Sequence, residues 1–424
     1  MATLPGVNYD KTVLPNGLRL VTEQVPAVKS VAVGVWVNVG SRDENDRERG
    51  LTHFIEHMLF KGTRRRSAKA IAASIESLGG SINAFTSREQ TCFHVLVLEK
   101  HLNAAVDVLS DILLNSTFTK INIEREKQVV YEEIAEIEET PSDHIHDLFS
   151  QVFWRNQALG QPILGSYKSL AAIDRRLIKA YLKEHYTGKN IVISAAGNVS
   201  HRKMLDIVKD KFRLESGRPV ATNGSIPPRD FALKCFRNGS NQAHLCLGFP
   251  GLNFGHVDRF ALLCLNTYLG GGMSSVLFQK IREDKGLAYT VYSFADFYRD
   301  SGVFGIYLAT EKSRARQAMD IVVDELKKVK RRKLTTAQLD TIKTQIKGNL
   351  LLGLESTTGR MNRLGRFESL TGKYLSVEDT IRAIDKTSAS DIIAMANNII
   401  DANKMTITSL GPIKNSDLSG IKWA

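Results

Sequence analysis

The segment Gly80-Ser-Ile-Asn-Ala-Phe-Thr-Ser87 precedes a strand-like run and then Asn103-Ala-Ala-Val-Asp-Val-Leu-Ser-Asp-Ile-Leu113. The second half of the chain repeats this order with Gly286-Leu-Ala-Tyr-Thr-Val-Tyr-Ser293, another strand-like run and Arg316-Gln-Ala-Met-Asp-Ile-Val-Val-Asp-Glu-Leu326. The spacing is far longer than the period of a solenoid repeat. The echo therefore indicates an old duplication, in which two halves of the chain share one fold.

The segments around the first copy of the echo mix strand and helix signals. Strand signals lie at residues 13–21, where Asn16-Gly17 marks a turn, and at 30–39, 83–85 and 91–98, whereas helical patterns cover about 50–60, 68–78 and 102–114. Mixed runs of this kind predict an α+β fold, with helices packed on a mainly antiparallel sheet in each half.

Residues 214–230 are rich in Pro, Gly, Ser and Asn and show no apolar period, which is typical of a linker. A chain of 424 residues is also too long for one ordinary hydrophobic core. The sequence therefore predicts an N-terminal half over residues 1–213, a linker over 214–230 and a C-terminal half over 231–424.

The composition is that of a globular protein, with 43% hydrophobic and 24% charged residues. No apolar run reaches the roughly 20 residues that a membrane-spanning helix needs, and the N-terminus has neither a signal-peptide nor a transit-peptide pattern. We therefore expect a cytoplasmic protein without a membrane partner. The four cysteines are scattered without a CxxC pair, so they are expected to be reduced and buried.

The net charge of +12 includes two basic clusters, at residues 64–66 and 327–333. The second cluster ends a helical pattern, where positive charge is favoured, and neither cluster is interleaved with aromatic residues. The pattern argues against nucleic acid as a partner.

The chemistry is concentrated in Gly50-Leu-Thr-His53-Phe-Ile-Glu56-His57-Met-Leu-Phe60-Lys-Gly62. On a helix, His53 and His57 lie one turn apart on one face and can bind one metal ion, with Glu56 beside them. Nitrogen ligands of this kind favour zinc, and a catalytic zinc site needs a third protein ligand. The order His-x-x-Glu-His is an inverzincin signature. The alternative is a chance grouping on the polar face of an amphipathic helix.

A third ligand is sought in the acidic helical pattern of residues 123–139. Glu126 and Glu133 are seven residues apart and share a helix face, whereas Glu132 is rotated by about 100° from Glu133. The pair can point together at the histidines, or the acidic residues can form an ordinary solvated face. The equivalent stretch of the second half, Val257–Cys264, has no such histidines, so the chemistry is assigned to the first half.

With these motifs in place, nearly the whole chain resembles the pitrilysin/insulinase family of zinc metallopeptidases. It is most similar to the half-length branch with the mitochondrial processing peptidase subunits and bacterial homologues. In that family the third zinc ligand is a glutamate some seventy-odd residues after the second histidine, with another glutamate seven residues before it; here 133 − 57 = 76 and 133 − 126 = 7. The resemblance implies that His53, His57 and Glu133 bind Zn²⁺, that Glu56 is the general base, and that Glu126 orients a ligand from behind.

The resemblance extends to the second half, where Arg282 and Tyr289 match an Arg and a Tyr that face the zinc in the family. It implies that Arg282 grips a substrate carbonyl or terminus and that Tyr289 donates to the developing oxyanion. A further match is the edge strand that pairs with extended peptides, which here is formed by Asn83, Ala84, Phe85 and Thr86. The Gly270–Ser275 loop is shorter than the glycine-rich loop of the non-catalytic processing-peptidase subunit, and Val276 stands where relatives often carry Arg. The resemblance therefore leaves open whether this protein processes presequences.

The expected function is that of a zinc-dependent endopeptidase that cleaves extended peptides or unfolded segments inside a closed chamber, with metal-activated water. The resemblance also implies a homodimer, or a heterodimer with a related subunit. One alternative is a non-proteolytic scaffold or assembly subunit of the same fold, although such proteins typically lose the zinc residues. The other alternative is a zinc-dependent lyase with the same motif, but the known lyase of this kind has a much shorter chain. The remaining histidines, His144 and His146 among them, are interpreted as structural or exposed.

Overall fold

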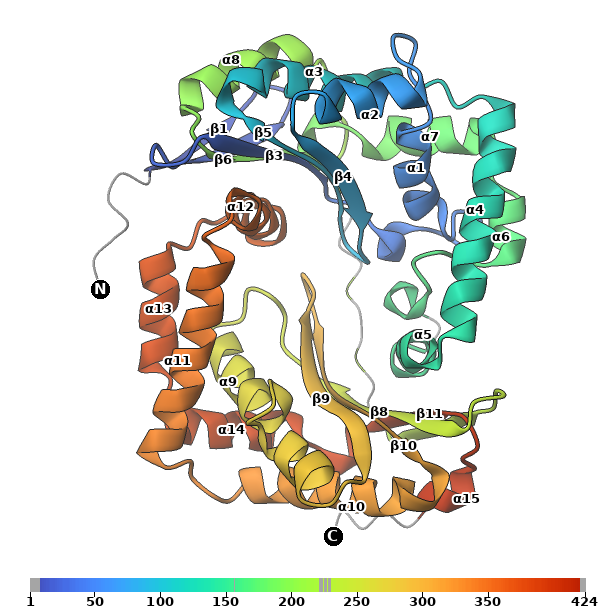
Figure 1. The fold of residues 1–424 in the computed structure, drawn as a ribbon, viewed down its shortest axis with the longest axis vertical. Coiled ribbons are helices and arrows are strands. Elements are labelled where there is room, and N and C mark those ends of the chain that lie inside the picture. Colours follow the sequence, from blue (N-terminus) through green and yellow to red (C-terminus); the bar gives the residue numbers. More distant parts are fainter. Residues whose placement is uncertain (1–7, 156, 221–223, 225–226, 228–229, 420–424) are drawn as a thin grey trace. The chain divides into compact units, whose positions relative to one another are not determined.

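The computed structural model describes residues 8–155, 157–220, 224, 227 and 230–419. These residues form two compact units (Figure 1). Unit 1 holds the described residues of Met1–Ile134, Gln161–Thr222 and Leu351–Leu375, and unit 2 holds those of Ala135–Gly160, Asn223–Leu350 and Ser376–Ala424. Each unit therefore includes one short segment from the other half of the sequence.

Unit 1 is built on a six-stranded sheet with the order β1-β2-β6-β3-β5-β4. Its strands are β1 (Asn8–Val13), β2 (Arg19–Gln24), β3 (Ser30–Val37), β4 (Ser81–Thr86), β5 (Thr91–Leu98) and β6 (Ile191–Gly197). All neighbours are antiparallel except β2 and β6. β4 is an edge strand, since β5 is its one partner among the described residues.

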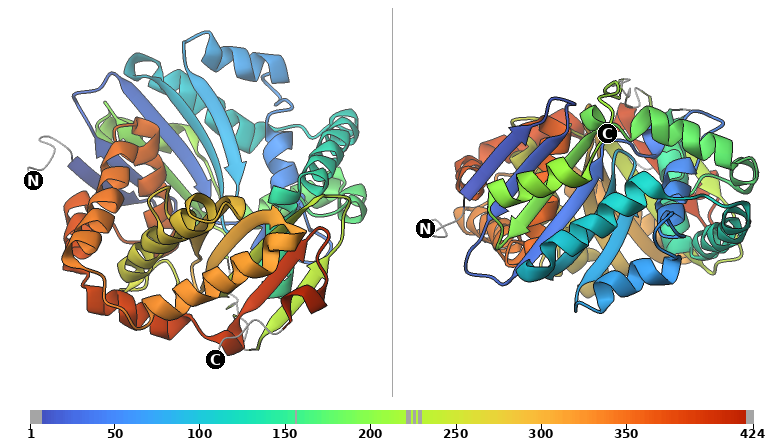
Figure 2. Two further views of the ribbon diagram at one scale, coloured as in Figure 1. Left: turned by 60° about the horizontal axis from the view of Figure 1, so that its bottom comes forward. Right: turned by 90° about the horizontal axis from the view of Figure 1, so that it is seen from above.

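One face of this sheet carries the main core of unit 1, because alternate side chains of each strand point to the same side. In β3 these are the valines at positions 31, 33, 35 and 37. The helices that cover this face are α1 (Leu51–Leu59), α2 (Ala68–Glu76), α3 (Leu102–Asn115), α7 (Arg175–His185) and α8 (His201–Lys211). Figure 2 (right) looks onto this face, with α2 and α3 in front of the strands.

The opposite face of the same sheet receives α12 (Thr357–Thr371), which comes from the C-terminal half of the sequence. Two glycines permit the close approach: a Cβ built on Gly34 would lie 2.3 Å from Met361 Sδ, and one on Gly365 would lie 2.0 Å from Trp36 Nε1. An ion pair between Arg360 and Glu23, at 2.5 Å, also holds the helix to β2.

Unit 2 is built on a five-stranded sheet with the order β7-β11-β8-β10-β9. Its strands are β7 (Ala232–Phe236), β8 (Gln242–Pro250), β9 (Ala288–Phe297), β10 (Gly302–Glu311) and β11 (Thr406–Leu410), and only β7 and β11 are parallel neighbours. Helices α9 (Arg259–Gly270), α10 (Lys312–Val329) and α14 (Ala389–Ile399) cover one face. The other face receives α5 (Pro141–Phe153), from the N-terminal half of the sequence, through Phe149 and its neighbours.

The remaining elements connect and flank these layers. The longer helices are α4 (Lys120–Glu139), α11 (Thr336–Gly353) and α13 (Val377–Lys386), and the short ones are α6 (Tyr167–Ala171) and α15 (Asn415–Leu418). Single turns are η1 (Ser41–Asp43), η2 (Glu99–His101), η3 (Ala158–Gly160), η4 (Gly188–Asn190), the π-helical η5 (Phe278–Glu283) and η6 (Ala402–Lys404). In the part of the chain that the structure describes, every helix is too short or too polar to span a bilayer.

The predicted α+β fold with two sheets covered by helices is confirmed. The two echoed segments become edge strands, β4 and β9, and each is followed by a second strand and a helix. The division into halves at 1–213 and 231–424 stays a prediction. Seven positions of the predicted linker, 221–223, 225–226 and 228–229, lie outside the described residues.

The basic cluster at residues 64–66 is largely engaged within unit 1. Arg66 Nη2 lies 2.5 Å from Asp107, and its Nη1 lies 2.6 Å from the buried Asp111. Arg65 is also paired with Asp107, at 2.9 Å. These two arginines therefore connect the loop after α1 to α3.

Candidate metal centre

The two histidines of the motif project from α1 on the same side. They are one turn apart, and their ring centroids are separated by 4.5 Å. The opposite side of α1 is apolar and carries Phe54, Ile55 and Met58, which are almost fully buried in the core. Burial of that side determines the rotation of the helix and directs His53 and His57 out of the core.

Helix α4 brings Glu133 to the histidines. Its Oε1 lies 3.6 Å from His57 Nε2, and its Oε2 lies 3.8 Å from His53 Nε2. One ligand atom from each of the three residues can be chosen so that all lie within 4.8 Å of one another, and this is the one such His/Cys/Asp/Glu group among the described residues. Glu132, one position earlier, is exposed. Two imidazole nitrogens and one carboxylate oxygen form a donor set that suits zinc.

Glu126 contacts the ring nitrogen of His57 that is not the one near Glu133. His57 Nδ1 lies 2.9 Å from Glu126 Oε1, and the other oxygen of this carboxylate lies 2.7 Å from Lys61 Nζ. Burial alone would raise the pKa of Glu126, but the hydrogen bonds from His57 and Lys61 outweigh it and lower the pKa. The charged carboxylate favours the His57 tautomer with the proton on Nδ1, which leaves Nε2 free to bind a cation.

The two histidines differ in their electrostatic surroundings. Burial, together with the neighbouring His57, lowers the pKa of His53 to about 4. Burial also acts to lower the pKa of His57, but the hydrogen bond to Glu126 and the charges of Glu133, Glu126 and Glu56 raise it overall. His53 Nδ1 is buried and has no hydrogen-bond partner among the described residues. Its imidazole is thus neutral at pH 7.

Glu56 is held beside the histidines by the edge strand. The hydroxyl of Thr86, in β4, donates to Glu56 Oε2 at 2.6 Å. Burial raises the pKa of Glu56, while the Thr86 hydrogen bond and His57 act in the opposite direction and Glu133 raises it further. A carboxylate with a raised pKa, held in one orientation, suits a general base.

The outer edge of β4, next to this carboxylate, has no strand partner among the described residues. Asn83 and Phe85 are exposed, whereas Ala84 and Thr86 are half-buried, because successive side chains of a strand point to opposite faces of the sheet. Phe85 also packs edge-on against Trp36, with ring centroids 5.6 Å apart. The backbone groups on the outer edge of β4 are those that an extended peptide needs for pairing.

Arg282 and Tyr289 lie together in unit 2. Arg282 is the next-to-last residue of η5 and Tyr289 is the second residue of β9, and the guanidinium lies 4.4 Å from the centroid of the Tyr289 ring. Tyr289 is 76% exposed. Its side chain therefore lies at the surface and not in the core of unit 2.

His146, interpreted from sequence as structural, takes part in a polar group in the core of unit 2. Its Nε2 lies 2.9 Å from the Tyr292 hydroxyl, and its Nδ1 lies 3.8 Å from Cys246 Sγ. Burial lowers the pKa of His146, against the effects of Asp143 and Asp147.

Two contacts at the centre were missed by sequence reasoning. Lys61 lies two residues beyond the end of α1, so the period of the helix gave no signal for its approach to Glu126. The hydrogen bond from Thr86 to Glu56 had no sequence signal, because 30 residues separate them.

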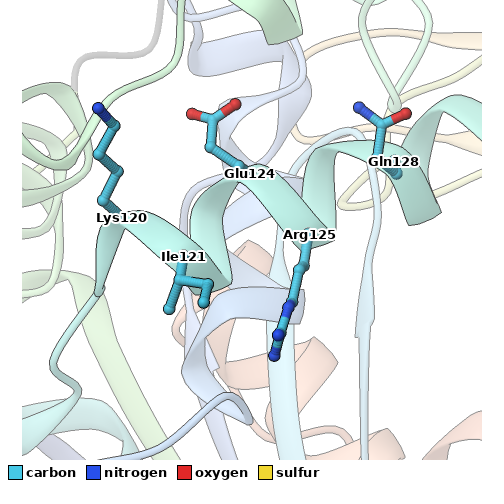
Figure 3. A pocket seen from close by; sticks show the side chains of 5 residues that line it. All are labelled: Lys120, Ile121, Glu124, Arg125 and Gln128. Carbon is cyan, nitrogen blue, oxygen red and sulfur yellow. The ribbon is translucent and has the colours of Figure 1, made fainter.

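A hollow of about 690 Å³ runs along the first half of α4. Its lining residues are Lys120, Ile121, Glu124, Arg125 and Gln128. In Figure 3 the side chains of Lys120, Glu124 and Gln128 point to one side of the helix and those of Ile121 and Arg125 to the other, so they do not converge on one point. None of them is among the predicted site residues, so this hollow is separate from the candidate metal centre.

Comparisons with known proteins agree on one group. Residues 19–166 match the family model described as Insulinase (Peptidase family M16), and residues 172–346 match the one described as Peptidase M16 inactive domain. The chain is 42% identical over 384 residues to a Bacillus subtilis protein named uncharacterized zinc protease YmxG, covering 91% of this chain and 94% of the relative. It is 36% identical over 419 residues to an uncharacterized zinc protease of Rickettsia bellii, covering 97% and 99%.

Two solved structures share the fold. A protease from Helicobacter pylori superposes with a TM-score of 0.90 at 24% identity, covering 96% of this chain and all of that chain. A peptidase M16 inactive domain from Pseudomonas fluorescens superposes with a TM-score of 0.89 at 20% identity, covering 96% and 99%.

Proposed function

The chain belongs to the insulinase family of peptidases, family M16, and on this premise we propose that it is a zinc-dependent endopeptidase that cleaves extended peptides or unfolded segments. The observation that carries the proposal is the convergence of His53, His57 and Glu133, whose ligand atoms can all lie within 4.8 Å of one another. Relatives over almost the full chain are named zinc proteases, which supports the same metal.

The three residues fit zinc by their chemistry. His53 is neutral at pH 7 because burial lowers its pKa, and His57 is held with Nε2 toward Glu133. A catalytic zinc has three protein ligands and leaves a position for water, and these three residues provide that number. When bound, the ion supplies Lewis acidity and lowers the pKa of water toward ~7.

In this mechanism Glu56 accepts the proton of the attacking water at a carboxylate oxygen. The same group, now protonated, then passes the proton to the departing amine. The hydrogen bond from Thr86 keeps Glu56 in place during both transfers. Because Thr86 belongs to β4, a peptide paired along Asn83–Thr86 would place its backbone beside the base.

Three parts of the proposal concern the rest of the molecule. Arg282 is proposed to bind a backbone carbonyl or terminus of the substrate, and Tyr289 to donate to the oxyanion. The N-terminal half is proposed to be the catalytic half and the C-terminal half the substrate-binding half. Catalysis in a closed chamber, within a homodimer or a heterodimer with a related subunit, completes the proposal.

The test has two measurements on the purified protein. Metal analysis should give about one zinc ion per chain, since the described residues contain a single ligand group. Glu56→Gln should keep the ion, because Glu56 is not a ligand, but lose peptide cleavage by roughly 10²- to 10⁴-fold. Metal-free wild-type protein, never exposed to chelator, would contradict the zinc site. Undiminished cleavage by Glu56→Gln would exclude this base. Zinc without any peptide cleavage in the wild type would favour the scaffold alternative.

A further inference from the structure

Helix α1 needs partners for its first backbone N–H groups, and its own N-cap residue cannot supply a side chain. The N-cap is Gly50, which has a φ of 84° in the left-handed region. A Cβ built on Gly50 would lie 2.4 Å from the carbonyl oxygen of Leu164 and 3.0 Å from Gly165 Cα. The Ser, Thr, Asp or Asn that usually caps a helix is therefore excluded at this position.

Glu44 supplies the missing acceptors from six residues upstream. Its Oε2 accepts from Gly50 N at 2.8 Å, and its Oε1 accepts from Thr52 N at 2.7 Å. Both oxygens of one carboxylate are thus directed at the positive end of α1, where a negative charge is favoured. The Thr52 hydroxyl lies 2.9 Å from the buried Tyr181 hydroxyl, which connects the same turn to α7.

The carboxylate is kept in this place at a cost in free energy. Burial raises the pKa of Glu44 to about 8, although the hydrogen bonds from Thr52 and Gly50 act in the opposite direction. A residue chosen only for solubility in this loop would remain in solvent. The position of Glu44 is therefore explained by its hydrogen bonds to the first turn of α1.

The two histidines depend on the helix backbone to different degrees. His57 is aimed by the hydrogen bond between its Nδ1 and Glu126. His53 has no partner at Nδ1 among the described residues, so its direction follows from the position of its backbone. That backbone comes directly after Thr52, which Glu44 anchors. With nine residues, α1 is also too short to be stable by its own propensity.

We propose that Glu44 is a positioning residue of the metal centre, which anchors the first turn of α1 and thereby aims His53 at the ion. The inference rests on the proposed zinc site for its effect on metal binding. The anchoring itself is independent of that site, because it concerns the backbone of α1 alone.

The experiment compares Glu44→Ala and Glu44→Gln with a matched control, Glu48→Ala. Glu48 lies in the same loop, and its side chain accepts from Asn45 N, which is outside α1. All proteins are measured at pH 8.5, above the pKa of about 8 to which burial raises Glu44. The readouts are amide hydrogen exchange of residues 50–59 in metal-free protein, zinc affinity by competition with a chromophoric chelator, and the absorption spectrum of the Co²⁺ form.

Glu44→Ala should speed exchange in the first turn of α1 by about tenfold, as the loss of a cap predicts. Its zinc affinity should fall by about tenfold, and its Co²⁺ bands should shift, because a misdirected His53 changes the ligand field. Glu44→Gln should lie between Glu44→Ala and wild type, since its amide oxygen can accept one of the two N–H groups. It keeps the volume of the side chain, so it also serves if Glu44→Ala does not fold.

Wild-type exchange, affinity and spectrum in both Glu44 variants would overturn the inference. So would losses equal to those of Glu48→Ala, because they would reflect a general loosening of the loop. A wild-type protein that binds no zinc would contradict the proposed function. The exchange of residues 50–59 would still decide whether Glu44 anchors α1.

Discussion

His57 Nδ1 and Glu126 Oε1 lie 2.9 Å apart, although 69 residues separate them in the sequence. The same carboxylate contacts Lys61, so α4 is attached both to His57 and to the loop that follows α1. Glu133, two turns further along α4, is thereby brought to the same face. The contact therefore positions two proposed ligands, His57 directly and Glu133 through the helix.

Replacement of Glu126 should weaken metal binding without removing a ligand. In Glu126→Ala we expect a 10- to 100-fold loss of zinc affinity, the usual effect of losing a carboxylate behind a ligating histidine. Glu126→Gln should lose less, because its amide oxygen can still accept from His57. Chelator competition measures both. Glu132→Gln, an exposed change on the same helix, is the control and should leave affinity unchanged.

Removal of the Thr86 hydroxyl should slow catalysis while leaving the metal in place. Thr86→Val keeps the branched shape of the side chain but deletes the donor to Glu56, so we expect kcat to fall by about tenfold at constant zinc content. Thr86→Ser restores a hydroxyl and should recover most of the rate. Peptide cleavage and metal analysis are measured on the same samples. An unchanged kcat in Thr86→Val would show that Glu56 needs no orientation by β4.

The proposed role of Tyr289 predicts a loss that depends on its hydroxyl alone. Tyr289→Phe preserves the aromatic ring beside the Arg282 guanidinium, so local packing should persist. If the hydroxyl donates to the oxyanion, kcat should fall by about 10²- to 10³-fold. Arg282→Lys should instead raise KM, because a lysine cannot form paired hydrogen bonds. Wild-type kinetics in Tyr289→Phe would exclude the oxyanion role.

The half-buried His146 predicts a loss of stability in acid. Burial lowers the pKa of His146 in the folded protein below its ordinary 6.5, so the unfolded chain binds the proton more tightly. Stability should therefore fall as the pH drops through 6.5 and continue to fall until the folded-state pKa is reached. Asp143, Asp147, Tyr292 and Cys246 surround the ring, and the net effect keeps this direction.

The measurement is calorimetry of metal-free protein between pH 7.5 and 5.5, since zinc binding would add its own pH dependence. His146→Gln retains a polar group near Tyr292 but cannot titrate, so its melting temperature should fall less over this range. His144→Gln, on the same helix, is the matched control and should behave as wild type. Equal slopes in His146→Gln and wild type would contradict the prediction.

Local patterns predicted most of the elements near the site. The strand at residues 91–98 and the helix at 102–114 were predicted to within one residue of β5 and α3. Helix α1 was also predicted, one residue longer at each end than Leu51–Leu59. These elements follow from apolar period and turn residues, which act over a few positions and can be read along the chain.

Contacts between distant segments were harder to foresee. The reciprocal placement of α12 on the first sheet and of α5 on the second had no signal in the pattern of either helix. This placement depends on how closely a helix can approach a sheet, for example where Gly34 and Gly365 lack a side chain. Shape complementarity of this kind arises only when the segments have come together.

The amino-acid sequence by itself determined the local chemistry of the centre. Two histidines and a glutamate lie on one face of α1 because a helix repeats every 3.6 residues, and Glu126 and Glu133 share a face of α4 for the same reason. Only the tertiary structure decided that these faces meet and which groups contact the site residues. Glu126, which is paired with Lys61, contacts His57; Thr86 contacts Glu56; and Glu44 contacts the start of α1. Helical period is a property of neighbours in the chain, whereas a hydrogen bond between segments 30 or 69 residues apart exists only after the core has packed them together.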